Sequence, residues 1–104
     1  MHNDPVLSML GIAAKSGNVV SGEFSTEKAV KTGHAYLVIV STEASGNTKK
    51  SFCNMTDFYH VPCYCYGRKE ALGRCIGKEF RASLAVTDEN LAKAVEKKLK
   101  EHTV

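Results

Sequence analysis

Apolar residues along the chain follow two periods, one typical of helices and one typical of strands. Val6, Leu10 and Ala13 recur at helical spacing, whereas residues 36–40 form an uninterrupted β-rich apolar run, typical of a strand buried on both faces. The patterns alternate and predict helices over 5–17, 22–33, 45–61, 68–76 and from 88 onward, with strands over 19–20, 36–41, 63–66 and 82–86. This alternation predicts an α/β fold, a three-layer α/β/α sandwich on a four-stranded sheet, as a single domain over residues 1–104.

Two strand–helix junctions share one pattern, in which small residues stand directly before a helix. Gly22 precedes the second helix and Ser45 precedes the third. A helix start offers free backbone N–H groups and the positive end of the helix dipole to an anion. If the two preceding strands are parallel, both helix starts lie at the same edge of the sheet, with Lys28, Lys49 and Lys50 around it. Because the charge of Lys49 and Lys50 opposes the dipole in a first helical turn, we expect them to bind an anion such as a phosphate backbone.

Composition and charge exclude few classes of protein function. The chain is 43% hydrophobic and 24% charged, as in an ordinary globular protein, and its net charge of +3 favours anionic partners weakly. The first residues lack the basic and apolar segments of a signal peptide, and no apolar stretch approaches the ~20 residues of a membrane span. We therefore expect a cytoplasmic protein with no membrane partner.

The four cysteines allow two interpretations. Cys53, Cys63, Cys65 and Cys75 are expected to be reduced thiols packed as small hydrophobic side chains, with Cys63 and Cys65 on one face of a strand beneath a helix. The alternative is a zinc site that includes His60. Because the chain has no paired C-x-x-C motif, we expect no metal.

Catalytic motifs are missing from the sequence. The chain has neither a Gly-x-Gly-x-x-Gly nor a Walker motif, and Glu43, Asp57 and Asp88 lie in separate predicted elements. Nothing in the sequence places a nucleophile beside a base. We therefore expect a protein that is not an enzyme and has no cofactor.

Several short motifs, in their order and spacing, are similar to those of a known family. They occupy residues 10–17 (LGIAAKSG), 20–22, 28–30, 32–33, 37–40, 44–50, 59–62, 72–77 (LGRCIG) and 85–88. The chain thus resembles the ribosomal protein L7Ae/L30e superfamily of RNA-binding proteins, in particular its small bacterial members. The resemblance implies a mixed sheet and binding of kink-turn RNA, a sharply bent duplex whose bulge is flanked by sheared G·A pairs.

The resemblance also implies which loops contact the RNA. Family members use the first strand–helix junction, the next strand–helix loop and the loop before the last strand, which here are residues 21–28, 43–50 and 77–81. The RNA-binding residues expected on this basis are Ser21, Gly22, Glu23, Phe24, Ser25, Lys28, Asn47, Lys49, Lys50, Lys78, Phe80 and Arg81.

The first junction departs from the family's pattern. Strong binders carry Gly-x-Asn-Glu-x-Thr-Lys, where Asn and Glu contact the G·A pairs; here Phe24 and Ser25 replace that pair and Glu27 replaces Thr. Phosphate binding is therefore better supported than base recognition. Phe24 has two interpretations, a platform for an unpaired base or a core residue.

The sequence predicts a non-catalytic RNA-binding protein that recognises structured, kink-turn-like RNA and is associated with the ribosome or translation. One alternative is a protein-interaction module on the same fold that has lost RNA binding. Another is a detached substrate-recognition domain related to those of RNA methyltransferases. No sequence feature indicates an oligomer.

Overall fold

The helices and strands predicted from the hydrophobic pattern are all present in the computed structural model, which describes residues 4–102. Their order is α1 (Pro5–Lys15), β1 (Val19–Ser21), α2 (Glu23–Lys31), β2 (Leu37–Val40), α3 (Gly46–Phe58), β3 (Cys63–Cys65), α4 (Lys69–Cys75), β4 (Ser83–Val86) and α5 (Glu89–His102). The expected alternation of helices and strands is confirmed.

Polar side chains fix where three of the helices begin. The Asp4 carboxylate accepts hydrogen bonds from the first-turn N–H groups of Val6 and Leu7, at 2.9 and 3.1 Å. Ser45 Oγ accepts a bond from the Thr48 N–H at 3.1 Å, and Asp88 accepts one from the Leu91 N–H at 2.9 Å. Each bond satisfies a backbone donor that the helix itself leaves open, which explains the bounds.

The sheet is mixed, and its strand order is β1-β4-β2-β3. β2 and β3 are parallel, whereas β4 is antiparallel to both of its neighbours, β1 and β2. Ser21 at the end of β1 pairs with Leu84, and Val40 at the end of β2 pairs with Ser83. Since both strands run opposite to β4, β1 and β2 run in the same direction.

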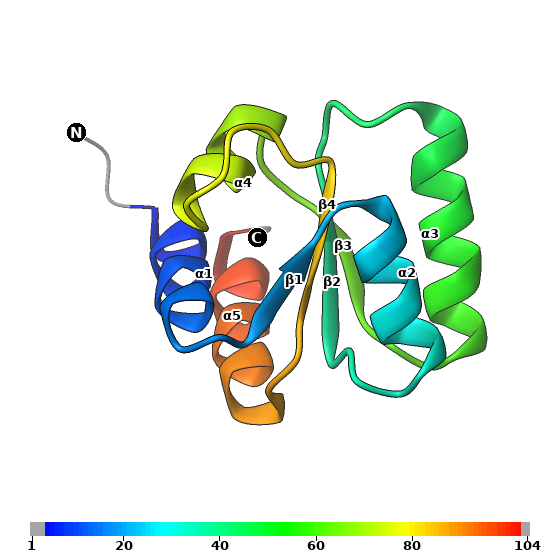
Figure 1. The fold of residues 1–104 in the computed structure, drawn as a ribbon, viewed down its shortest axis with the longest axis horizontal. Helices are drawn as coiled ribbons and strands as arrows, with labels where there is room; N and C mark the ends of the chain where they lie inside the picture. The colour runs from blue at the N-terminus through cyan, green and yellow to red at the C-terminus, as the bar shows by residue number, and fades with distance from the viewer. Residues whose placement is uncertain (1–3, 103–104) are drawn as a thin grey trace.

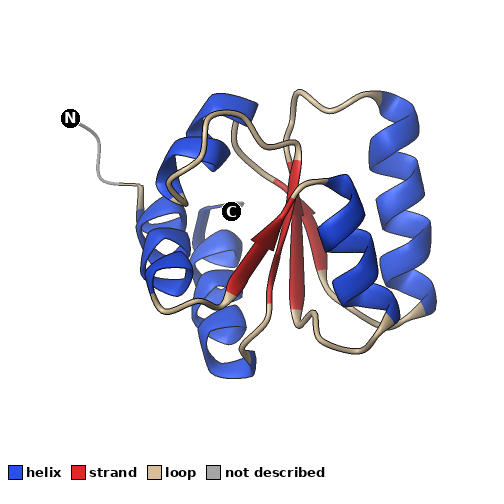
Figure 2. Ribbon diagram, viewed as in Figure 1, coloured by secondary structure: helices blue, strands red, loops and turns tan. Residues whose placement is uncertain are grey.

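Helices cover both faces of the sheet and bury a core on each. α1, α4 and α5 lie on one side of the strands, and α2 and α3 lie on the other (Figures 1 and 2). All residues of the central strands β2 and β4 are buried. Their alternate side chains pack into two clusters, one including Leu10, Ile39 and Leu99 and the other including Val30 and Phe52. The three-layer α/β/α sandwich is thus confirmed.

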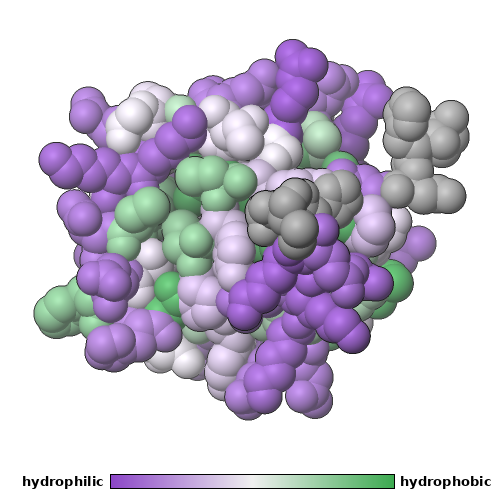
Figure 3. Space-filling view, turned by 180° about the vertical axis from the view of Figure 1, so that it is seen from behind, coloured by the Kyte–Doolittle hydropathy of each residue, from purple (hydrophilic) through white to green (hydrophobic). Residues whose placement is uncertain are grey.

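Two of the cysteines do not pack as expected. Cys63 and Cys75 are half-buried, but Cys53 and Cys65 are exposed, so the prediction of packed thiols is wrong for this second pair. β3 is an edge strand, and α3 shields its first residue but leaves Cys65 to solvent. Seen from behind, apolar side chains gather on the surface between α3 and β3 (Figure 3). All four cysteines are free thiols.

The half-buried thiols predict a loss of stability at alkaline pH. Burial raises the pKa of Cys63 and of Cys75 to about 11, from an ordinary value of 9.0. Ionisation is easier in the unfolded chain, so their contribution to stability is complete below pH 9 and is lost as pH rises through 11. We expect the urea midpoint to fall between pH 8.5 and 10.5, and to fall less in a Cys63→Ala/Cys75→Ala variant. A Cys53→Ala/Cys65→Ala control, which removes the exposed thiols, should fall as the wild type does; equal behaviour of all three proteins would contradict the prediction.

Gly73 of α4 predicts a second effect on stability, because it packs directly against the loop before β4. A Cβ atom at this position would clash with the carbonyl of Glu79 and lie 2.8 Å from the backbone nitrogen of Phe80. We expect Gly73→Ala to lower the free energy of unfolding by about 1–3 kcal/mol, measured by urea denaturation. Gly46→Ala is the matched control, since Gly46 is also helical but a Cβ atom there would meet nothing within 4 Å. A similar effect of the two substitutions would show that crowding at Gly73 is not the cause.

Candidate nucleic-acid interface

The three loops singled out in the sequence meet at one edge of the sheet. β1 and β2 end at this edge, and the antiparallel strand β4 begins there. Consequently residues 21–28, 43–50 and 77–81 lie around the same end of the strands, at the top of the view in Figure 1. The condition set by the sequence, that the first two strands run in the same direction, is met. We call this end of the molecule the loop edge.

Hydrogen bonds fasten the first and third loops to each other. The Gly22 N–H donates to the Ser83 carbonyl at 2.9 Å, which extends the β1–β4 pairing by one residue. Arg81 Nε donates to Ser21 Oγ at 2.9 Å, and a second guanidinium nitrogen donates to the Phe80 carbonyl at 2.7 Å. Arg81 is half-buried, so its clearest role is to hold these two loops together.

The start of α2 leaves its backbone donors open. Gly22 occupies the N-cap position at φ 91° and ψ 158°, and no side chain caps the helix. That backbone conformation is essentially restricted to glycine. The following side chains, Glu23, Phe24 and Ser25, are all exposed, and Phe24 retains 77% of its accessible surface. The interpretation of Phe24 as a core residue is therefore wrong.

The start of α3 brings further predicted residues to the loop edge. Ser45 caps the helix, and the first turn carries Asn47, which is exposed. Lys49 is half-buried and Lys50 is exposed. They are the fourth and fifth residues of α3 and follow its first turn, rather than lying within it as the sequence predicted. α3 thus adds an amide and two cations beside the α2 start. Lys28 is also exposed, but it lies in the last turn of α2 rather than at its start.

The remaining predicted residues lie at the periphery. Lys78 and Phe80 are exposed, and together with Glu70 and Arg74 of α4 they line a shallow groove of about 270 Å³. They share this groove with α4 rather than with α2 or α3. Arg74 is paired with Glu70 at 3.1 Å, so the groove already contains a neutralised ion pair.

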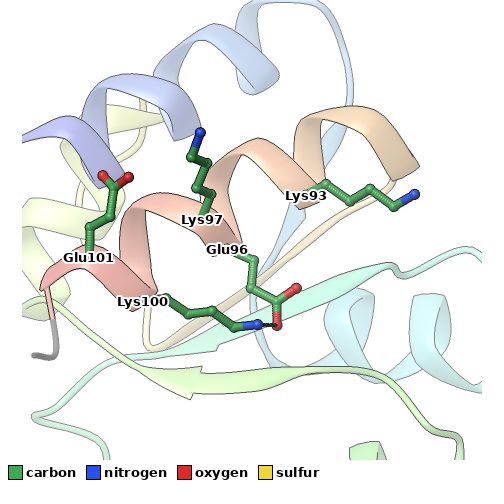
Figure 4. A pocket seen from close by; sticks show the side chains of 5 residues that line it. All are labelled: Lys93, Glu96, Lys97, Lys100 and Glu101. Carbon is green, nitrogen blue, oxygen red and sulfur yellow. Dashed lines mark ion pairs between the residues drawn. The ribbon is translucent and has the colours of Figure 1, made fainter.

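The lysines at the loop edge differ electrostatically from those of α5. Within residues 4–102, Lys28, Lys49, Lys50 and Lys78 have no carboxylate within 4.0 Å. On α5, by contrast, three lysines lie 3.5–4.0 Å from a glutamate of the same helix, and Figure 4 shows one such pair. The members of these pairs are Lys93–Glu89, Lys98–Glu101 and Lys100–Glu96. Within residues 4–102, the loop edge thus carries four lysines without an ion pair, whereas three of the four lysines of α5 are paired.

The junction between β3 and α4 also lies at the loop edge. It was not included in the site predicted from the sequence. Because β3 is parallel to β2, the junction between β3 and α4 lies beside the loop after β2. Glu43 accepts a hydrogen bond from the Lys69 N–H at 2.9 Å and one from Arg68 Nε at 3.1 Å. These bonds, the backbone one first, lower the pKa of the Glu43 carboxyl. Gly67 before this helix repeats the pattern of Gly22 and was the available signal in the sequence.

Other functional classes find no geometric support within residues 4–102. No group of three or more His, Cys, Asp or Glu side chains there is placed to hold a metal ion. In the same part of the chain, no helix has the length and apolar character needed to cross a membrane. The absence of a metal, a cofactor and an enzymatic activity stays a prediction from the sequence.

The fold is an α/β/α sandwich whose loops at one sheet edge carry several exposed lysines. The chain belongs to the Ribosomal protein L7Ae/L30e/S12e/Gadd45 family, whose model matches residues 4–96. This finding confirms the resemblance drawn from the short motifs.

Two relatives show how similar the chain is to other members. It is 39% identical over 84 residues to RNA-binding protein YlxQ of Bacillus subtilis, a match that covers 81% of this chain and 84% of that protein. It is 33% identical over 84 residues to large ribosomal subunit protein eL30 of Sulfolobus acidocaldarius, covering 79% of this chain and 81% of that protein.

Solved structures give the same fold. A protein from Bacillus halodurans superposes with a TM-score of 0.91 and 33% identity, over 94% of this chain and 99% of that one. The 15.5kD RNA binding protein of Giardia lamblia superposes with a TM-score of 0.80 over 97% of this chain and 90% of that one. At 20% identity, the second likeness concerns the fold alone.

The backbone at Gly22 predicts a cost for any side chain there. A methyl group at Gly22 would meet nothing within 4 Å, so only the backbone conformation opposes it. We expect Gly22→Ala to lower the free energy of unfolding by about 1–3 kcal/mol, measured by urea denaturation. Glu23→Ala, the control at the next exposed position, should change it by less than about 0.5 kcal/mol. An equally small change for Gly22→Ala would mean that this backbone conformation is not required.

Proposed function

We propose that this protein binds structured RNA through the loop edge and that its target is a kink-turn. The observation that carries the proposal is the meeting of three loops at one sheet edge, with lysines that have no carboxylate partner within residues 4–102. Support also comes from the relatives, since proteins matched by the chain include two named RNA-binding protein YlxQ and three named large ribosomal subunit protein eL30. An association with the ribosome or translation is part of the same proposal.

Phosphate binding is the first component of this function. The open N–H groups of the α2 start suit one phosphate, because helix starts combine free donors with a positive dipole end. Lys28, Lys49 and Lys50 then meet neighbouring phosphates along a bent backbone. Such contacts fix position and orientation on the RNA without recognising its sequence.

Base recognition is the second component, and here it differs from the family's pattern. Phe24 and Ser25 occupy the positions of the Asn-Glu pair that contacts sheared G·A pairs in the strongest binders. The loop edge accordingly favours an RNA chosen mainly by its bent shape, with a weaker dependence on the G·A pairs. No chemical reaction is part of the proposal.

A titration against matched RNAs tests the proposal. A hairpin containing a standard kink-turn is compared with the same hairpin after its G·A pairs are replaced by Watson–Crick pairs, which straighten the duplex. The wild-type protein should bind the kink-turn hairpin more tightly. If neither RNA binds at low salt, the proposal is wrong, and the alternative of a protein-interaction module is favoured.

Salt dependence separates phosphate contacts from the rest. With roughly three to five phosphates neutralised, the slope of log K against log salt should lie near −3 to −5. Lys28→Ala should weaken binding of both hairpins by similar factors and make the slope shallower by about one unit. Lys97→Ala on α5 removes the same charge from an exposed position on the other side of the sheet, and should change neither quantity by much. Equal effects of the two substitutions would show that net charge, rather than the loop edge, attracts the RNA.

A further inference from the structure

Two of the cysteines come from different elements and meet at the edge of the sheet. Cys53 lies in the middle of α3, and Cys63 is the first residue of the edge strand β3. The two side chains share a hydrogen bond, so their sulfur atoms lie next to each other. We call Cys53 and Cys63 the α3–β3 thiol pair.

The packing of α3 on β3 holds this pair together. Phe52 and Thr56 of α3 are buried, and Cys63 packs against the same core cluster as Phe52. Thr56, one turn after Cys53, hydrogen-bonds the Cys63 thiol as well. Thr56 Oγ1 also donates to the Cys53 carbonyl at 3.2 Å. The contact between the two thiols is therefore built into the helix–strand packing.

The two thiols differ in exposure, and the difference gives them different chemical roles. Cys53 is exposed, so a small oxidant in solution can reach it. Cys63 is half-buried, and burial raises its pKa to about 11, from an ordinary value of 9.0. Because the thiolate is the reactive form, Cys63 is protected from direct attack near neutral pH. An exposed thiol beside a second, resolving thiol is the arrangement of cysteines that undergo reversible oxidation.

We propose that the α3–β3 thiol pair is a site of reversible oxidation, at which hydrogen peroxide converts the two thiols into a disulfide that joins α3 to β3. In the first step the Cys53 thiolate attacks one peroxide oxygen. The O–O bond breaks, the released hydroxide takes up a proton to become water, and Cys53 is left as a sulfenic acid.

In the second step the Cys63 sulfur attacks the Cys53 sulfur. The S–S bond forms as the S–O bond breaks, and the departing hydroxide leaves as water with the proton of the Cys63 thiol. Two electrons have then passed from the thiol pair to the peroxide. The contact between the two side chains offsets the raised pKa of Cys63, because a reaction between groups held together is strongly accelerated.

Geometry selects Cys53, rather than another cysteine, as the partner of Cys63. Cys65 is exposed and points to the same face of β3, but it acts on the Cys63 thiol through its charge, without the hydrogen bond that Cys53 makes. Cys75 lies in α4, on the other side of the sheet (Figure 1). The thiol pair does not depend on RNA binding, so this inference and the proposed function can fail separately.

Thiol counting on the full-length protein tests the site. Dilute, reduced protein is treated with a small molar excess of hydrogen peroxide and quenched with catalase, and the remaining thiols are alkylated in denaturant and counted by mass spectrometry. We expect the wild type to lose two of its four thiols and to stay a monomer, with Cys53 and Cys63 linked in the proteolytic digest. Dithiothreitol should restore both thiols.

Single variants assign the two roles. Cys53→Ala, at an exposed position, should keep its three remaining thiols under the same treatment. In Cys63→Ala, Cys53 should accumulate as a sulfenic acid that dimedone traps, because no resolving thiol is in contact with it; the wild type should be labelled far less. Cys65→Ala is the matched control, since it removes the other exposed thiol and should form the disulfide as the wild type does.

Several outcomes would overturn the inference. One is a wild type that keeps all four thiols, and another is a disulfide that joins Cys63 to Cys65 or links two chains. Accumulation of the Cys53 sulfenic acid in the wild type, without a disulfide, would also show that the pair does not react. Because Cys63 is half-buried, its variant is compared at matched folded fraction in urea; if it does not fold, the wild-type and Cys53→Ala thiol counts still decide the question.

Discussion

The position of β4 in the middle of the sheet is the constraint on which the loop edge depends. β4 pairs antiparallel with β1 on one side and β2 on the other, so the ends of those strands and its own start share one edge. A β4 parallel to both neighbours would send the loop at residues 77–81 to the opposite end of the sheet. The hydrogen bonds from Gly22 to Ser83 and from Arg81 to Ser21 then set the distance between the first and third loops.

Several polar and charged groups at this edge are left without partners by the protein itself. α2 begins at a glycine with no side-chain cap, and the nearby lysines have no carboxylate within 4.0 Å among residues 4–102. Glu43, the carboxylate in the second loop, is occupied by Lys69 and Arg68. The edge thus holds several unpaired cations, although the net charge of the whole chain is only +3.

The sequence predicted the helices, the strands and the three-layer architecture because each depends on local periodicity. The run at residues 36–40 and the caps at Ser45 and Asp88 are examples. Strand order was not predictable in this way, since it depends on pairing between segments far apart, such as Ser21 with Leu84. The exposure of Cys65 follows from strand order too, because an edge strand is covered on fewer sides. Of the predicted site, the loop positions followed from strand–helix junctions and family resemblance, whereas the bond from Arg81 to Ser21 between two of the loops required the packed structure.

The central position of β4 also has a consequence for synthesis of the protein. A ribosome releases the chain from its N-terminus, and β1, α2, β2 and α3 all leave the exit tunnel before residues 83–86 do. Until then β1 lacks its neighbour β4 in the sheet, and the first loop lacks the bonds to Arg81 and Ser83. The loops that line the edge are therefore assembled only when most of the chain has been made. In a nascent chain of this protein, the three loops therefore come together only once the domain is nearly complete.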